Sequence, residues 1–270
     1  MVSNRIEIAA ISNLPIAEKG TLERQFSHKF WEQVFDVLSK FPVVIFAGNL
    51  FIQCPEDSLE TVQRRLQLFL DLLKGLHTPT VAVLGAREYS HGHRQFIKKN
   101  LREAGVHVLT GSPKHTLYRF RPPMGARSSE KTIGILGFSG TQAGLHPSSA
   151  DAMEPWILGK TSTSTPADVL DSHLSKIQAD GVLQQVIPVV PIPISYYMAR
   201  VIDRHQRLVN SVITGSGDRN RTETSTSGNI PIYTVTVPSK DDLINDARIR
   251  GTGEIKAEDL ITRIQIHPRV

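Results

Sequence analysis

Short apolar runs alternate with amphipathic segments through the first hundred residues, and this alternation restricts the fold more than any other feature of the chain. The apolar runs that read as buried strands are RIEIAAIS (5–12), VVIFAG (43–48), TVAVLG (80–85) and VHVL (106–109). The intervening segments 21–40, 58–76 and 93–105 carry apolar residues at helical spacing. A strand–helix repeat of this kind predicts an α/β fold, with a sheet whose strands are joined by helical crossovers.

The second half of the chain is richer in predicted strands. These are 115–120, 132–138, 183–190, 210–215, 231–237 and 260–267, interrupted by predicted helices at 166–178 and roughly 195–208. The segments 122–131, 140–155, 159–166 and 217–229 are rich in Gly, Pro, Ser and Thr, which predicts surface loops.

Composition narrows the class of protein. The chain has 270 residues and a single cysteine, Cys54, so no internal disulfide can form and a reducing, cytoplasmic location is expected. Since there is no run of eighteen apolar residues, no membrane span is expected. The net charge is +5 and the basic residues are scattered, for example at 64–65, 98–99 and 219–221. Nucleic-acid binding is therefore only weakly supported.

Five of the predicted strand ends carry short motifs in a fixed order: ISNLPI (11–16), FAGNLF (46–51), LGAREY (84–89), VVPIPI (189–194) and ITGSGD (213–218). These motifs, each at the end of an apolar strand and most with a glycine, follow an order that resembles that of the calcineurin-like metallophosphoesterases. Their pattern is D-x-H, G-D, G-N-H-[DE], a histidine before a proline-rich turn, and G-H-x-H. The resemblance covers almost the whole chain. It implies one domain over 1–270, a four-layer αββα sandwich of two mixed β-sheets flanked by helices.

The residue types that the family uses to bind metal are replaced in this chain. The positions that the resemblance marks as a vestigial site are Asn13, Pro15, Asn49, Ala86, Arg87, Glu88, Pro191, Ser216 and Asp218, of which only Glu88 is of the family type. Asn49 stands where the family has a metal-bridging aspartate. Arg87 stands where it has a general-acid histidine.

The replacements change what this site can hold. The family's reaction, as the resemblance implies it, uses two divalent metals about 3.5–4 Å apart. A neutral amide such as that of Asn49 does not offset the charge of a cation, and the Arg87 guanidinium repels one. We therefore expect no metal cofactor and no catalytic residue. The expected role is that of a catalytically inactive binding, regulatory or scaffolding module with a protein partner, whose identity the sequence does not give.

Two alternatives stay open. One is a residual phosphoesterase with a non-standard site of one metal, built on Glu88, Asp218, His91 or His93. The other is a metal-free phosphate or nucleotide binder centred on Arg87, a residue that would otherwise pair with a nearby carboxylate. Asn13 and Asn49 also suit a simpler role, which is to cap helices or to turn the chain after their strands, and Glu88 suits the start of a helix.

Overall fold

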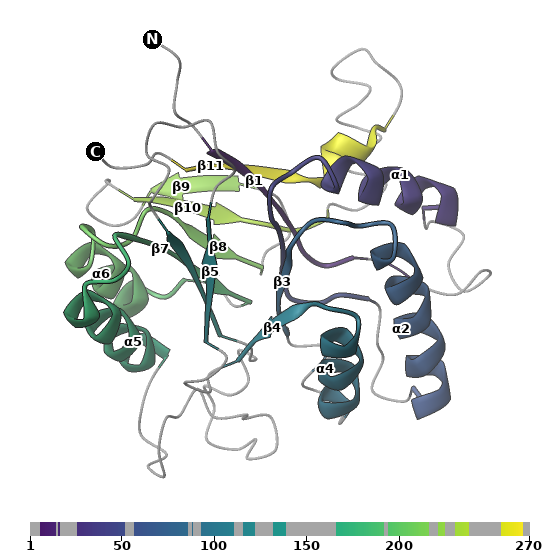
Figure 1. The fold of residues 1–270 in the computed structure, drawn as a ribbon, viewed down its shortest axis with the longest axis horizontal. Coiled ribbons are helices and arrows are strands. Elements are labelled where there is room, and N and C mark those ends of the chain that lie inside the picture. The colour runs from purple at the N-terminus through teal and green to yellow at the C-terminus, as the bar shows by residue number, and fades with distance from the viewer. Residues whose placement is uncertain are drawn as a thin grey trace.

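Two β-sheets pack face to face, and helices cover the outer face of each (Figure 1). The computed structural model describes residues 6–14, 16, 26–51, 57–85, 88, 93–110, 116–121, 132–138, 166–191, 194–215, 221–224, 230–237 and 255–266. Within these residues the order of layers is helix, sheet, sheet, helix. This confirms the α/β sandwich that the resemblance implies.

The first sheet has five strands in the order β11-β1-β2-β3-β4. Their bounds are β1 Ile6–Ile11, β2 Val44–Ala47, β3 Thr80–Val83, β4 His107–Leu109 and β11 Thr262–Ile266. Strands β1 to β4 are parallel, and β11 pairs antiparallel with β1. The helices of this half are α1 (His28–Leu38), α2 (Leu59–Leu73) and α4 (Arg94–Glu103). The first two begin at serine caps, because Ser27 and Ser58 accept a backbone N–H of the first turn.

The second sheet has six strands in the order β5-β6-β7-β8-β10-β9. Their bounds are β5 Leu117–Phe120, β6 Ile133–Gly137, β7 Gln185–Val190, β8 Val212–Thr214, β9 Arg221–Thr224 and β10 Pro231–Thr234. The helices α5 (Pro166–Asp180) and α6 (Tyr196–Arg204) cover its outer face (Figure 1). A short 3₁₀ turn, η3 (Ala257–Leu260), precedes β11.

The core has three layers because the central strands are apolar on both faces. Between the sheets lie fully buried aliphatic residues such as Ile8, Ile45, Val81, Ile135 and Val189. Separate apolar layers join each sheet to its helices. Continuous apolar strands are typical of sheets that are covered on both sides, which is why the first-half strands could be recognised from their sequence.

Several predicted elements differ from the structure, as three examples show. The segment 217–229 was predicted to be a loop, but β9 forms within it and pairs antiparallel with β10, so pairing to a neighbour outweighs a polar composition at this edge of the sheet. The helix predicted at 21–40 begins at His28 among the described residues, since Ser27 is its cap. The strand predicted at 260–267 begins at Thr262, because η3 occupies the residues before it. In the described part of the chain, no helix is both long enough and apolar enough to cross a membrane.

Candidate functional site

Strand ends from both sheets meet at one place, and glycines allow them to approach backbone to backbone. A Cβ atom on Gly215, after β8, would lie 1.4 Å from the carbonyl oxygen of Ala47 in β2. A Cβ atom on Gly48 would lie 2.9 Å from the Cβ of Pro191 and 3.1 Å from the Cα of Gly85. The glycines that end the apolar runs are therefore required by close packing between the two sheets, at the edge where ligands bind in open α/β sheets.

Asn13 and Asn49 turn the chain after β1 and β2, and their side chains bond to each other. Both have positive φ angles, 56° and 50°, a conformation that asparagine tolerates better than most residues. The Asn49 Nδ2 group donates a hydrogen bond to Asn13 Oδ1. Asn13 Nδ2 in turn donates to Thr236 Oγ1 at 2.8 Å and lies 3.3 Å from the carbonyl oxygen of Gly215. The pair thus links two strand ends of the first sheet to the second sheet.

Glu88 is fully buried, and its carboxylate accepts backbone N–H groups from two strand ends. Its Oε2 accepts from Gly85 at 2.7 Å and from Asn49 at 3.1 Å, and its Oε1 accepts from Leu50 at 2.7 Å. Burial raises the pKa of Glu88, while the backbone N–H bonds act to lower it. The backbone of Glu88 is helical, and its buried carboxylate fastens the loop after β3 to the loop after β2.

The described residues do not fit a dimetal centre. The amide of Asn49 points a donor at Asn13, both oxygens of Glu88 are engaged by backbone N–H groups, and Pro191 offers no ligand atom in its side chain. Pro191 is buried, and its Cβ would crowd any side chain at Gly48. Among the residues that the structure describes, no three His, Cys, Asp or Glu side chains gather into a group that could hold a metal.

The structure brings together four of the predicted positions: Asn13, Asn49, Glu88 and Pro191. The other five, and His91, lie outside the described residues: Pro15, Ala86, Arg87, Ser216 and Asp218. The remaining candidate, His93, directly precedes α4 and makes no capping hydrogen bond with its side chain.

Two polar residues of this region were not predicted from the sequence. The Ser12 hydroxyl lies 2.9 Å from the carbonyl oxygen of Gly215 and 3.0 Å from that of Gly48, and one of these accepts its proton. Thr236 accepts from Asn13, and the Val237 N–H donates to the Ser12 carbonyl at 2.8 Å. Apart from the contact between Ser12 and Gly48, these contacts join residues more than two hundred positions apart, so no local spacing could have indicated them.

Comparison with known proteins supports the fold. No protein-family model matches the sequence, and no curated protein matches it. Among solved structures, a dimetal phosphatase from Danio rerio superposes with a TM-score of 0.58 at 13% identity, over 87% of this chain and 88% of its own. A second solved structure superposes with a TM-score of 0.51 at 12% identity, over 97% of this chain and 99% of its own. The chain therefore shares the α/β fold of this dimetal phosphatase.

Proposed function

We propose that this protein is a catalytically inactive member of the metallophosphoesterase fold, and that it acts as a binding, regulatory or scaffolding module. The observation that carries the proposal is the hydrogen bond between Asn49 Nδ2 and Asn13 Oδ1. By the resemblance, these asparagines occupy two positions at which the family has metal-binding aspartates. A direct bond between them joins the two strand ends without a cation.

Charge explains why this bond favours a metal-free site. Two carboxylates in hydrogen-bonding contact repel each other strongly unless a cation or a shared proton lies between them. Two neutral amides attract instead, because one donates the proton that the other accepts. The pair at Asn13 and Asn49 is thus stable without metal, and its geometry gives no reason for a cation to bind.

Glu88 weakens the alternative of a residual enzyme with one metal. A metal ligand needs a free lone pair facing the ion, and both Glu88 oxygens face backbone N–H groups. Loss of turnover in a Glu88 variant would also be ambiguous, because the same substitution removes the bonds that hold Gly85 and Leu50. A variant at Asn49 is a sharper probe of any residual chemistry.

A binding role is supported by an exposed aromatic pair near the strand ends. Tyr196 and Tyr197 open α6, which follows β7 and Pro191, and they are 60% and 74% exposed. Their rings contact edge to face, and the Arg200 guanidinium donates to the Tyr196 hydroxyl. Tyrosine and arginine are enriched at protein interfaces, so this end of α6 suits contact with a protein partner.

The experiment that tests the proposal measures hydrolysis of an activated phosphodiester and an activated phosphomonoester. Wild-type protein is assayed with Mn²⁺, Ni²⁺, Zn²⁺ or Fe²⁺ beside Asn49→Ala prepared in the same way. We expect equal background rates for both proteins with every metal. Metal-stimulated turnover in the wild type that Asn49→Ala abolishes would overturn the proposal.

A further inference from the structure

The basic residues are scattered along the chain, but their excess over acidic residues falls in one continuous part of it. Residues 93–121 contain seven Lys and Arg residues but one acidic residue, Glu103, whereas the whole chain has 31 basic and 26 acidic residues. The rest of the chain therefore has 24 basic against 25 acidic residues, which is close to balance. The net positive charge of the protein originates in the segment that builds α4, β4 and β5.

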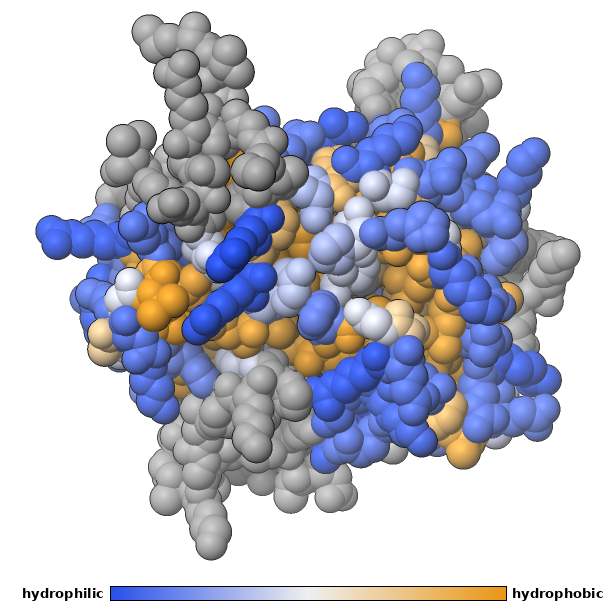
Figure 2. Space-filling model, in the orientation of Figure 1, coloured by the Kyte–Doolittle hydropathy of each residue, from blue (hydrophilic) through white to orange (hydrophobic). Residues whose placement is uncertain are grey.

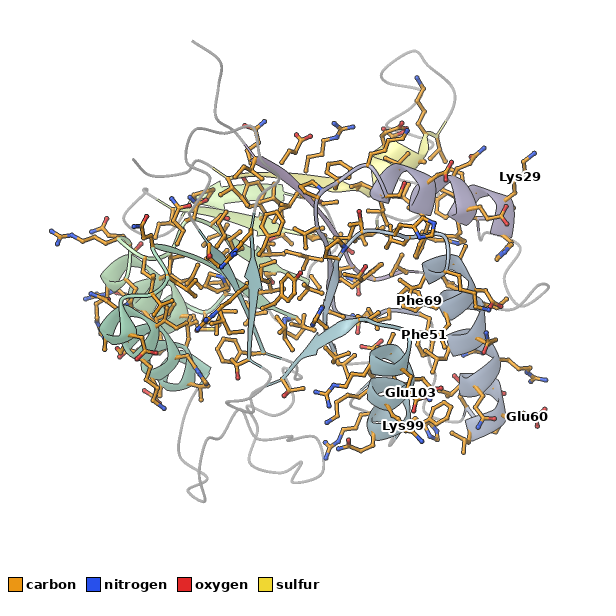
Figure 3. All side chains as sticks on the ribbon, viewed as in Figure 1. Lys29, Phe51, Glu60, Phe69, Lys99 and Glu103 are labelled. Atoms are coloured by element: carbon orange, nitrogen blue, oxygen red, sulfur yellow. The ribbon has the colours of Figure 1, made fainter. Side chains whose placement is uncertain are left out.

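The described residues of this segment, 93–110 and 116–121, lie together on one face of the molecule. Strand β4 is an edge of the first sheet and β5 is an edge of the second, and the two lie side by side next to α4 (Figure 1). Arg102, Arg119 and Arg121 are exposed on it, and none has a carboxylate partner among the described residues. Glu103 lies 3.8 Å from Lys99 on the exposed side of α4 (Figure 3), so the single acid of the segment already has a partner.

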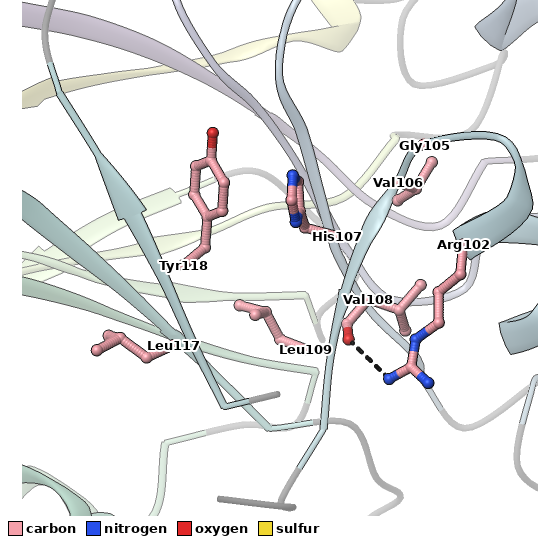
Figure 4. A pocket seen from close by; sticks show the side chains of 8 residues that line it. All are labelled: Arg102, Gly105, Val106, His107, Val108, Leu109, Leu117 and Tyr118. Atoms are coloured by element: carbon pink, nitrogen blue, oxygen red, sulfur yellow. Dashed lines mark hydrogen bonds between the residues drawn. The ribbon is translucent and has the colours of Figure 1, made fainter. Parts of the chain in front are cut away.

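A cavity of about 350 Å³ opens between these two edge strands. His107 and Leu109 line it from β4, and Tyr118 and Leu117 line it from β5 (Figure 4). The rings of His107 and Tyr118 contact each other, with centroids 4.5 Å apart and planes tilted by 42°. The cavity therefore has aromatic and aliphatic walls, and none of the described residues that line it is acidic.

Arg102 lies at the rim of the cavity with most of its hydrogen-bonding capacity unused by the described residues. Its Nη2 is 3.5 Å from the carbonyl oxygen of Val108, which is a long and weak contact (Figure 4). A guanidinium has five N–H donors, which suits a phosphate oxygen pair. Figure 2 shows this face with apolar and weakly polar atoms across its middle and hydrophilic side chains on either side.

We propose that this face binds single-stranded nucleic acid, with one unstacked base in the cavity and the neighbouring phosphates on the exposed arginines. Bases stack on aromatic side chains whatever their sequence, while a basic surface follows the backbone. The arginines lie on α4 at one side of the cavity and on or just after β5 at the other. A single phosphate would not contact both sides, whereas a strand with several phosphates would. Duplex nucleic acid does not suit the cavity, because its bases are already stacked.

This inference does not rest on the metal-free site and can fail separately from it. The cavity lies between β4 and β5, whereas the asparagine pair lies at the ends of β1 and β2. Metal-dependent hydrolysis would overturn the proposed function and leave this face unaffected. Lack of nucleic-acid binding would overturn this inference and leave the proposed function standing.

The test is fluorescence anisotropy with labelled twelve-residue oligo(dT) and oligo(rU), together with unlabelled AMP and poly-glutamate as competitors. We expect a dissociation constant that rises with salt with a log–log slope of about 2, as three phosphate contacts predict. Arg119→Glu lies on an exposed strand position and should weaken binding about 10-fold and reduce the slope. Tyr118→Leu should weaken binding about 10-fold through lost stacking. Lys29→Glu, an equal charge change on α1 (Figure 3), should stay within about 2-fold of wild type.

Several results would overturn the inference. Equal loss of affinity in Arg119→Glu and Lys29→Glu would show attraction by overall charge rather than by this face. Unchanged affinity in Tyr118→Leu, with folding verified by circular dichroism, would remove the role of the cavity. Competition by poly-glutamate as strong as that by oligo(dT) would indicate an acidic protein segment instead. Binding of AMP without binding of either oligonucleotide would limit the site to a free nucleotide.

Discussion

The side-chain amide of Asn49 donates its proton to the side-chain oxygen of Asn13, and this bond joins the ends of two parallel strands that are 36 positions apart in the chain. Asn13 continues the link to the second sheet through Thr236. The fold is similar to that of a dimetal phosphatase. In this protein, two neutral side-chain amides bond to each other at the ends of β1 and β2.

Asn49→Asp should destabilise the protein by about 2 kcal/mol at pH 7.5, because a carboxylate cannot donate to Asn13 Oδ1 and the two oxygens repel. The loss should shrink as the pH falls, since a protonated carboxyl group can donate again. Urea unfolding at pH 7.5 and pH 4.5 measures both effects. Asn100→Asp is the matched control, because its amide bonds only within α4 to the Phe96 carbonyl. Equal losses in the two variants would contradict a special role for the pair.

Glu88→Gln should destabilise the protein by about 3 kcal/mol, because one of the two carboxylate oxygens becomes an NH₂ group that faces backbone donors. Buried N–H groups of Gly85, Asn49 or Leu50 would then lack an acceptor. Thermal unfolding checks this, with Glu32→Gln on the exposed side of α1 as the control. Unchanged stability in Glu88→Gln would show that the carboxylate does not hold these loops.

Gly215→Ala should prevent folding or destabilise the protein by more than about 4 kcal/mol, since the added methyl would overlap the carbonyl of Ala47. Gly75→Ala is the matched control, because the closest atom to its added methyl is 3.7 Å away. Expression level and thermal unfolding of the two variants give the comparison. A stable Gly215→Ala protein would contradict the close backbone packing between the sheets.

His173 should make the protein sensitive to acid. The ring is buried against Phe138, and its Nε2 has no hydrogen-bond partner among the described residues. Burial, followed by the nearby Lys176 charge, lowers the pKa of His173 to about 4. The unfolded chain takes up a proton near pH 6.5, so stability is complete above that pH and falls as the pH drops toward 4. The loss should reach at most about 3 kcal/mol.

His173→Leu removes this titration and should flatten the stability profile between pH 6.5 and 4. Urea unfolding at intervals across this range measures the profile, and His28→Gln on exposed α1 should retain the wild-type slope. An unchanged slope in His173→Leu would show that other groups cause the acid sensitivity.

Much of the fold follows from local pattern. The apolar runs at 43–48 and 80–85 correspond to β2 and β3, and the apolar residues at helical spacing in 58–76 correspond to α2. These elements could be predicted because burial on both faces of a strand, or on one face of a helix, leaves a pattern in neighbouring residues. Strands at the edge of a sheet were harder to predict from the sequence. Strand β9 has no apolar pattern, and it exists through its pairing with β10.

The sequence could predict which strand ends form the candidate site, but it could not predict the hydrogen bonds between their side chains and backbones. Glu88 was expected at the start of a helix and does have helical backbone, but its burial among backbone N–H groups of two strand ends was not indicated by the sequence. The contact of Asn13 with Thr236 depends on how the two sheets meet, which no spacing along the chain encodes. The same is true of the cavity between β4 and β5, since His107 and Tyr118 meet only when these two edge strands lie side by side.

The most direct test of the central claim is the metal content of the purified protein. The protein is equilibrated with excess Mn²⁺, Fe²⁺, Ni²⁺ and Zn²⁺, dialysed, and analysed by mass spectrometry of the elements, and its melting temperature is measured with and without EDTA. The account predicts well under one bound metal per chain and the same melting temperature in both conditions. Two metals per chain, with a melting temperature that EDTA lowers, would contradict it.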